Sequence, residues 1–172
     1  MPRTASLYGA GVRSRAKGGR FDVTHPRPPR CAGSLIRALN AELSAQYPEE
    51  GANHFRLDAG EVVEGRGAFL VAYVEGRAVA CGAIRREDEH TAEIKRMYVA
   101  PEARGRGVGR AVLAALEAEG LRLGVSRIVL ETGERQLEAL ALYASAGFDR
   151  IPLFGEYIGS PLSVCMVKEL GR

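Results

Sequence analysis

The sequence has few of the residues that build metal sites or disulfide frameworks. It contains three cysteines, Cys31, Cys81 and Cys165, and three scattered histidines among 172 residues. The cysteines are widely spaced and no Cys-x-x-Cys pair occurs, so neither a zinc site nor a disulfide framework is predicted. We therefore expect a protein without a metal, in the reducing environment of the cytoplasm.

Long apolar runs are also missing. No stretch is long enough for a transmembrane helix, and the basic N-terminus lacks the apolar segment of a secretory signal. We therefore expect no membrane partner. With 172 residues and an ordinary globular composition, the chain is most simply one domain with a real core.

Positive charge is concentrated at the N-terminus. Residues 1–30 contain seven arginines and lysines against Asp22 alone, whereas the rest of the chain has more acidic than basic residues. We interpret residues 1–30 as a basic, flexible arm and residues 31–172 as the folded domain. Such an arm could bind nucleic acid or anionic lipid, but it has few aromatics and no amphipathic period, so no nucleic-acid partner is expected.

Periodicity and turn signals predict a mixed α/β fold. After a possible short strand near Phe21–Thr24, a helix is expected from about residue 31, with Ser34 as its N-cap and Pro48 after its end. The remaining pattern predicts strands at Phe69–Val74, Ala78–Ile84, 91–100, 125–132, 148–153 and 162–170, and helices at about 107–123 and 135–147.

The strand at 91–100 breaks strict alternation. Its apolar residues Ile94, Met97 and Val99 stand at i, i+3 and i+5, so all three can face the core only if one extra residue intervenes. This is the pattern of a β-bulge. A bulge leaves backbone amides unpaired and splays the strand from its neighbour, and free amides beside a gap can hold a carbonyl oxygen. The alternative is an ordinary mixed strand.

A glycine- and arginine-rich turn follows this strand and precedes a helix. The stretch Arg104-Gly105-Arg106-Gly107-Val108-Gly109-Arg110 lacks the Gly-Lys-Ser/Thr of a P-loop and fails the dinucleotide fingerprint. Glycines let the backbone approach a ligand, and the first N–H groups of a helix attract anions. The turn therefore predicts a phosphate or pyrophosphate site, unless it is an ordinary loop.

These residues resemble the GNAT N-acetyltransferase superfamily, in particular its small bacterial single-domain members. Arg104-x-x-Gly107-x-Gly109 after "YVAPE" matches the family's Q/R-x-x-G-x-G/A motif, and "EALALYASAGF" is similar to its second signature. The resemblance covers roughly residues 68–150. It implies a mixed, largely antiparallel central sheet with a splayed, bulged strand, flanked by helices. Gln136 departs from the family, because many members have Asn there.

The resemblance implies acetyl-coenzyme A as the donor and co-substrate. The pyrophosphate would lie on the backbone amides of Arg104 to Arg110. The pantetheine arm would run along the splayed strand near Met97, Tyr98 and Val99, with Gln136 offering an amide to it. The family transfers acetyl directly to an amine, so no nucleophilic cysteine or serine is required.

The resemblance also suggests the acid and the base. Tyr143 occupies the tyrosine position of the second signature and is the expected acid for the leaving thiolate, although it could be a core aromatic. Glu93 is the expected base, and the alternative for it is a salt-bridged strand end. Glu131 could replace it from the next strand. Glu156 and Tyr157 lie in the last hairpin loop, which is expected to border the acceptor site.

The sequence thus predicts an N-acetyltransferase that moves acetyl from acetyl-CoA to a primary amine of a small molecule. The first alternative is acetylation of a protein N-terminus or lysine, which would need an open groove. The second is a non-catalytic coenzyme A sensor or interaction module. The resemblance also allows a homodimer. Neither the acceptor nor the preferred acyl chain follows from the sequence.

Overall fold

The computed structural model describes residues 12–16, 19–24, 30–49 and 62–171. The described strands form a single eight-stranded sheet with the order β1-β2-β3-β4-β5-β6-β8-β7. The strands are β1 (Val12–Ala16), β2 (Gly19–Thr24), β3 (Gly67–Val74), β4 (Arg77–Arg86), β5 (Thr91–Val99), β6 (Arg127–Gly133), β7 (Asp149–Ile151) and β8 (Ser163–Glu169). The helices are α1 (Arg30–Gln46), α2 (Val108–Arg122) and α3 (Leu137–Ser145), with short 3-10 turns η2 (Pro101–Ala103) and η3 (Gly155–Tyr157).

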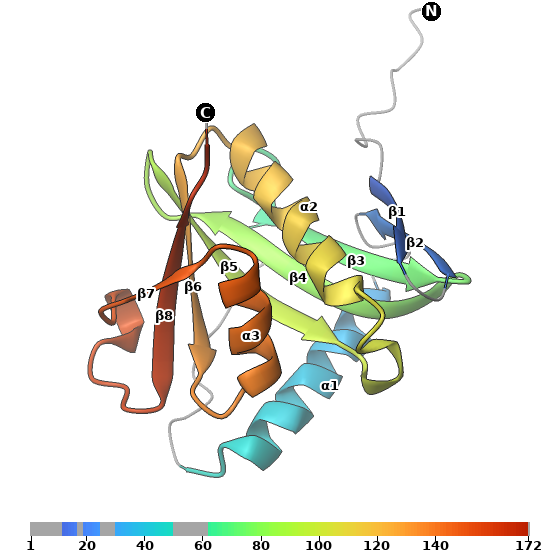
Figure 1. The fold of residues 1–172 in the computed structure, drawn as a ribbon, viewed down its shortest axis with the longest axis horizontal. Coiled ribbons are helices and arrows are strands. Elements are labelled where there is room, and N and C mark those ends of the chain that lie inside the picture. Colours follow the sequence, from blue (N-terminus) through green and yellow to red (C-terminus); the bar gives the residue numbers. More distant parts are fainter. Residues whose placement is uncertain (1–11, 17–18, 25–29, 50–61, 172) are drawn as a thin grey trace, which may run out of the picture.

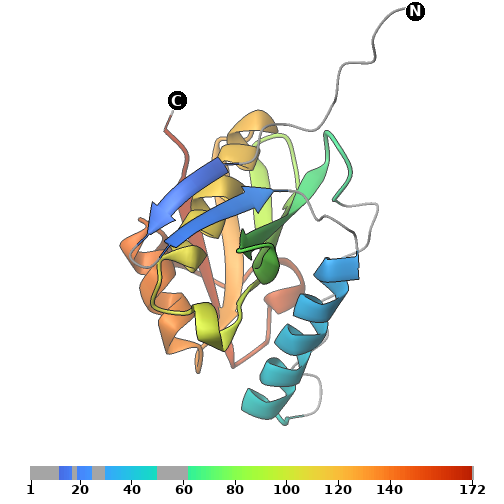
Figure 2. The ribbon, with the colours of Figure 1, turned by 90° about the vertical axis from the view of Figure 1, so that its right-hand side faces the viewer.

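The helices lie on both faces of the sheet. Helix α1 covers one face, and α2 and α3 cover the other (Figures 1 and 2). The strands β5 and β6 run parallel, and the other described strand pairs are antiparallel. The predicted mixed, largely antiparallel sheet with flanking helices is therefore confirmed. None of the described helices has both the length and the hydropathy needed to cross a membrane.

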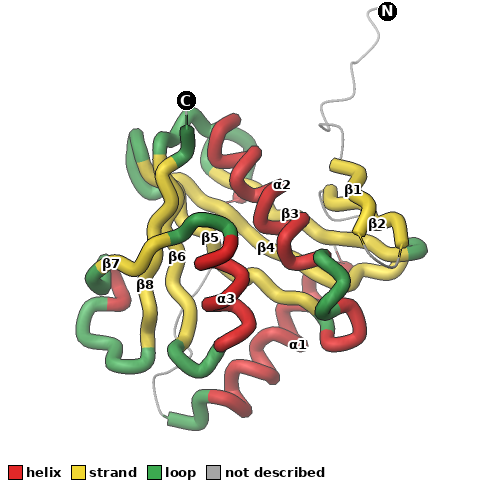
Figure 3. The backbone as a smooth tube through the Cα atoms, viewed as in Figure 1, coloured by secondary structure: helices red, strands yellow, loops and turns green. Residues whose placement is uncertain are grey.

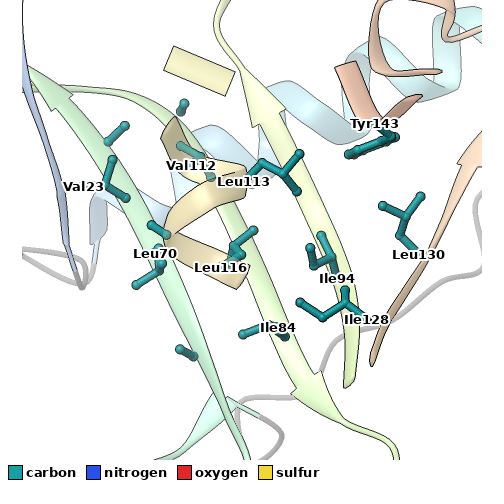
Figure 4. Close-up of a cluster of buried hydrophobic side chains, with 14 of the residues drawn as sticks. Val23, Leu70, Ile84, Ile94, Val112, Leu113, Leu116, Ile128, Leu130 and Tyr143 are labelled. Carbon is teal, nitrogen blue, oxygen red and sulfur yellow. The ribbon is translucent and has the colours of Figure 1, made fainter. Parts of the chain in front are cut away.

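The main core lies between the sheet and α2. Side chains of α2 such as Val112 and Leu116 pack on Leu70 and Ile84 of the central strands (Figure 4). A Cβ atom at Gly82 would lie 2.7 Å from a methyl carbon of Leu116, so this glycine allows the helix to approach the sheet. A smaller cluster lies under α1 and consists of Leu35, Leu39, Val71, Cys81 and Tyr98.

The predicted elements from residue 67 onward are confirmed, with small shifts at their ends. The predicted N-cap at Ser34 is wrong, because α1 begins at Arg30, directly after Pro29 in the sequence. Proline disfavours the helical conformation of the residue before it, so Pro29 marks the start of the helix better than Ser34 does. Within residues 1–30, two strands are present where only a short strand near Phe21–Thr24 was expected. The rest of this arm, which was predicted to be flexible, lies outside the described residues.

Candidate active site

Strand β5 contains the predicted bulge. Cys81 and Ala83 of β4 pair with Tyr98 and Lys95, so Arg96 and Met97 together lie opposite the single residue between them. Arg96 has a φ of 55°, a left-handed conformation that is uncommon for a residue other than glycine. The extra residue turns Met97 to the same face of the sheet as Ile94, where both pack against the main core.

Beyond the bulge, β5 and β6 separate. Their parallel pairing joins Thr91–Ile94 to Arg127–Leu130 and ends there, although β5 continues to Val99 and β6 to Gly133. The two strands diverge visibly towards their C-terminal ends (Figure 3). Past Ile94, the edge of β5 that faces β6 has no partner among the described strands. Its backbone groups can therefore pair with an extended ligand.

A cleft of about 850 Å³ passes through the sheet at this gap. Ile94, Met97 and Tyr143 line it from the face of α2 and α3. Leu39 and Leu43 of α1 line it from the opposite face. The rest of the lining includes Asn40, Ser44, Tyr47, Lys95, Arg96, Glu131, Thr132, Gly133, Gln136 and residues 157–163. Two ligands that enter from opposite faces can therefore meet inside the sheet.

Lys95 and Glu131 stand at the point where the strands separate. Ile94 is paired with Leu130, so these are the next residues on β5 and β6, and both line the cleft. The Glu131 carboxylate accepts a 2.6 Å hydrogen bond from the Ser163 hydroxyl. Burial raises the pKa of Glu131, with the Ser163 hydrogen bond acting in the opposite direction. A carboxyl group with a raised pKa is a suitable general base.

Glu93 lies within the paired part of β5, and both of its carboxylate oxygens accept hydrogen bonds. Its side chain is 2% exposed, one oxygen accepts a 2.5 Å hydrogen bond from the Tyr157 hydroxyl, and the other accepts from Arg85 at 2.9 and 3.2 Å. The Lys95 ammonium lies 3.7 Å from the first oxygen. Among the described residues that line the cleft, Glu93 is missing. This geometry favours Glu131 over Glu93 as the base.

Tyr143 brings a hydroxyl-bearing side chain to the cleft. It is buried on α3, packs beside Phe148 with ring centroids 5.9 Å apart, and lines the cleft. Burial, with a further contribution from Glu131, raises the pKa of its hydroxyl well above the usual range. The group therefore stays protonated at neutral pH and can donate a proton or hydrogen bond into the cleft.

The glycine turn surrounds the N-terminus of α2. Gly107 is the N-cap with a φ of 80°, and Gly105 also has a left-handed φ of 71°. The Ala111 amide donates to the Gly107 carbonyl at 3.1 Å, so the amides of Val108 to Arg110 precede the first bond of the helix and suit an anion. A Cβ atom at Gly109 would lie 3.3 Å from Leu142 and 3.4 Å from Val99, which indicates close packing of the turn against β5 and α3.

The arginines of the turn differ in their surroundings. Arg104 donates to both oxygens of Glu42 at 2.9 and 2.7 Å and to the Val99 carbonyl at 3.0 Å. Its charge is therefore balanced by α1, so it fixes the turn more than it attracts an anion. Arg110 donates to the exposed Ser145 hydroxyl at 2.8 Å and keeps its charge near the helix N-terminus.

The remaining predicted ligand residues are divided between the two faces. Met97 and Gln136 line the cleft, and the Thr132 hydroxyl donates to the Gln136 side-chain oxygen at 3.2 Å. Tyr98 instead turns its side chain to α1, beneath Arg104, so only its backbone is available. The turn packs against β5 through Gly109 and Val99, and the unpaired edge of β5 leads from there to Met97 in the cleft.

Sequence reasoning missed the wall that α1 contributes. The Tyr47 hydroxyl accepts a 2.9 Å hydrogen bond from the Arg135 amide and overlaps the place where a Cβ atom of Gly133 would be. Arg135 also pairs with Glu49 at 2.7 Å. These contacts join the end of α1 to the loop after β6, and Tyr47, Glu49 and Gly133 line the cleft. Nothing local in the sequence indicates that Tyr47 has a partner 88 residues away.

Comparisons with known proteins agree with this geometry. Residues 34–148 match the Acetyltransferase (GNAT) family. An IAA acetyltransferase of Azospirillum brasilense is 44% identical over 138 residues, which cover 79% of this chain and 88% of that protein. A protein of Klebsiella pneumoniae assigned as an acyl-CoA N-acyltransferase is 33% identical with a TM-score of 0.75, covering 88% of this chain and 98% of that one.

The fold is also shared with more distant proteins. The PaiA N-acetyltransferase of Thermoplasma acidophilum, solved in complex with coenzyme A, is 15% identical with a TM-score of 0.69. The match covers 87% of this chain and 99% of the PaiA chain. The bulged strand, the divergent pair β5 and β6 and the glycine turn are the features that the sequence motifs predicted. The chain belongs to the GNAT acetyltransferase family and is an acetyl-CoA-dependent N-acetyltransferase.

Proposed function

We propose that the protein transfers acetyl from acetyl-CoA to a primary amine of a small molecule. The observation that carries this proposal is the cleft of about 850 Å³ that passes through the sheet between β5 and β6. Contacts of Tyr47 and Arg135 tie α1 to the loop after β6 beside it. A volume of this size is typical of small-molecule sites, which favours a small acceptor over an extended peptide.

The donor is assigned to the face of α2 and α3. The backbone amides of Gly105 to Arg110 would hold its pyrophosphate, and the unpaired edge of β5 near Met97 and Val99 would pair with its pantetheine arm. Gln136, at the start of α3, would bind the same arm through its side-chain amide. The bound donor supplies an acetyl group activated as a thioester.

Glu131 is the proposed general base. An alkylammonium with a pKa of about 10 is only about one part in a thousand neutral at pH 7, which corresponds to about 4 kcal/mol. A carboxylate at the head of the gap removes this proton and leaves a nucleophilic amine. The Ser163 hydroxyl orients Glu131 for this task.

Tyr143 is the proposed acid. The thiol that leaves has a pKa of about 8.5, so protonating the thiolate assists the reaction modestly. The buried hydroxyl of Tyr143 lines the cleft on the side assigned to the donor. The thiolate that forms on acyl transfer receives its proton from this phenol, which is then reprotonated by solvent.

Thiol release from acetyl-CoA, measured against a panel of small primary amines and a panel of peptides, tests the proposal. We expect turnover with at least one class of small amine and kcat/KM values for peptides at least about 100-fold lower, a difference of about 2.7 kcal/mol. Preferential turnover of a peptide N-terminus or a peptide lysine would overturn the small-molecule assignment in favour of protein acetylation.

A further inference from the structure

The proposed chemistry leaves one buried cation in the cleft without a role. Lys95 has a side chain that is only 5% exposed, yet it is one of the residues that line the cleft. Burying an ammonium group is costly unless it is paired. Within the fold its partners are Glu93 at 3.7 Å, Glu156 at 2.6 Å and the ring of Tyr157, whose centroid lies 5.5 Å away.

The two carboxylates around Lys95 are not equivalent. Glu93 is buried beneath it and already accepts hydrogen bonds from Arg85 and Tyr157. Glu156 lies on η3, directly after Gly155, and is 46% exposed. It can therefore leave Lys95 and return to water at little cost, because a half-exposed carboxylate keeps much of its hydration.

Lys95 also stands in a fixed relation to the proposed base. The pairing of Ile94 with Leu130 makes Lys95 and Glu131 neighbours across the first unpaired step, on the same face of the sheet. No ion pair joins these two side chains among the described contacts. A ligand that places its amine at Glu131 thus has its adjacent substituent within reach of Lys95.

Apolar side chains line the cleft on the α1 side and on the loop before β8. Leu39 and Leu43 of α1 line one wall, and Ile158, Pro161 and Leu162 line the loop before β8. Ile158 is 71% exposed, which is high for an isoleucine. These surfaces suit an aliphatic or aromatic group and lie beside the charged pair.

We infer that Lys95 binds a carboxylate of the acceptor, and that Glu156 holds this position until the acceptor replaces it. The acceptor class is then a small amino acid with an apolar side chain: its amine faces Glu131 and its carboxylate faces Lys95. This inference rests on the proposed function and specifies its substrate class.

The test compares leucine, phenylalanine and methionine with their carboxamides, which lack the negative charge. Calorimetric Kd values, measured without any acetyl donor, and kcat/KM values are determined for wild type, Lys95→Met and Glu156→Gln. Lys168→Met is the matched control, because Lys168 also pairs with a glutamate, Glu117, but is not among the described residues that line the cleft. An acid and its amide differ in the pKa of their amine. For each variant, the ratio of the value for the acid to the value for the amide, in Kd and in kcat/KM, is therefore compared with the same ratio in wild type.

We expect Lys95→Met to weaken binding of the acids at least about tenfold and that of the amides less than about twofold. Glu156→Gln should strengthen binding of the acids, and Lys168→Met should change neither. Equal losses for acid and amide in Lys95→Met, or weaker acid binding in Glu156→Gln, would overturn the inference. Should Lys95→Met not fold, Glu156→Gln decides alone.

Failure of the inference and failure of the proposed function give different results. If wild type acetylates simple amines but prefers the amides once intrinsic amine reactivity is allowed for, the carboxylate site is wrong and the function stands. If wild type acetylates no small amine at all, both are overturned.

Discussion

The Tyr157 hydroxyl donates a 2.5 Å hydrogen bond to Glu93, a residue on β5 that lies 64 positions earlier in the chain. Burial and the nearby Glu93 carboxylate raise the pKa of Tyr157, so it acts as a neutral donor. The contact ties the loop that lines the cleft to the central sheet.

This contact predicts that Glu93 is a positioning residue. Glu93→Gln should lower the free energy of unfolding by about 3 kcal/mol, because Arg85 and Lys95 lose a buried counter-charge. Denaturant unfolding measures this loss. The acidic limb of the kcat profile should remain but move to lower pH, because the Glu93 charge contributes to the raised pKa of Glu131, whereas disappearance of that limb in Glu93→Gln would identify Glu93 as the base.

Glu131 should control the acidic side of the activity profile. As a base it must be ionised, so kcat should rise with pH through a pKa above the ordinary glutamate value of about 4.3. Glu131→Gln should lose at least about 100-fold in kcat and lose this limb. Thiol-release assays at a series of pH values check both effects. Ser163→Ala removes only the orienting hydroxyl, so its kcat should lie between those of wild type and Glu131→Gln.

The same group has an opposite effect on stability. A raised pKa means that the folded protein binds the proton more tightly than the unfolded chain does. Glu131 therefore stabilises the fold at pH values below its unfolded pKa, and this contribution is lost as pH rises through the folded pKa. The free energy of unfolding of Glu131→Gln, relative to wild type, should increase between about pH 4 and pH 7. A decrease over this range would show that the carboxylate is stabilised by its surroundings.

Tyr143→Phe should reduce kcat and leave the fold intact. The ring remains in its buried position beside Phe148, and only the hydroxyl is removed. We expect kcat to fall by about 10- to 100-fold with little change in the KM for acetyl-CoA, as befits modest assistance to a thiol leaving group. An unchanged kcat, measured where chemistry limits the rate, would assign Tyr143 to packing alone.

The glycine turn can be tested with a matched pair of variants. Gly107→Trp and Gly76→Trp both place a side chain at a glycine with a φ near 80°, but Gly76 lies in the hairpin between β3 and β4. Each should cost about 1 kcal/mol of stability through backbone strain. Only Gly107→Trp should abolish calorimetric binding of acetyl-CoA. Equal binding by both variants would move the pyrophosphate away from the turn.

The parts of the site that follow from local spacing could be predicted from the sequence. The spacing of Ile94, Met97 and Val99 predicts the bulge, and the glycine-rich turn predicts a glycine at the start of α2. Both depend on the backbone of a single segment, so a short stretch of residues is enough to specify them.

The parts that depend on distant pairing could not be predicted. Glu93 and Glu131 are both strand carboxylates, and only the loop at Tyr157 determines that the first is enclosed while the second lines the cleft. The turn as a whole was expected to bind an anion, but the charge of Arg104 within it is balanced by Glu42, which lies 62 residues earlier. The sequence alone indicates no role for Lys95, because its role depends on its position opposite Glu131 on the neighbouring strand.

The short pairing of β5 with β6 has a mechanical consequence. Four residues of each strand form the seam that joins a five-stranded part of the sheet to a three-stranded part. A small rotation about such a hinge is amplified with distance along the two strands, which act as lever arms. The width of the cleft is therefore set by the contact that lies beyond the hinge, Tyr47 on the loop at Arg135, whereas the contact of Tyr157 with Glu93 strengthens the hinge itself.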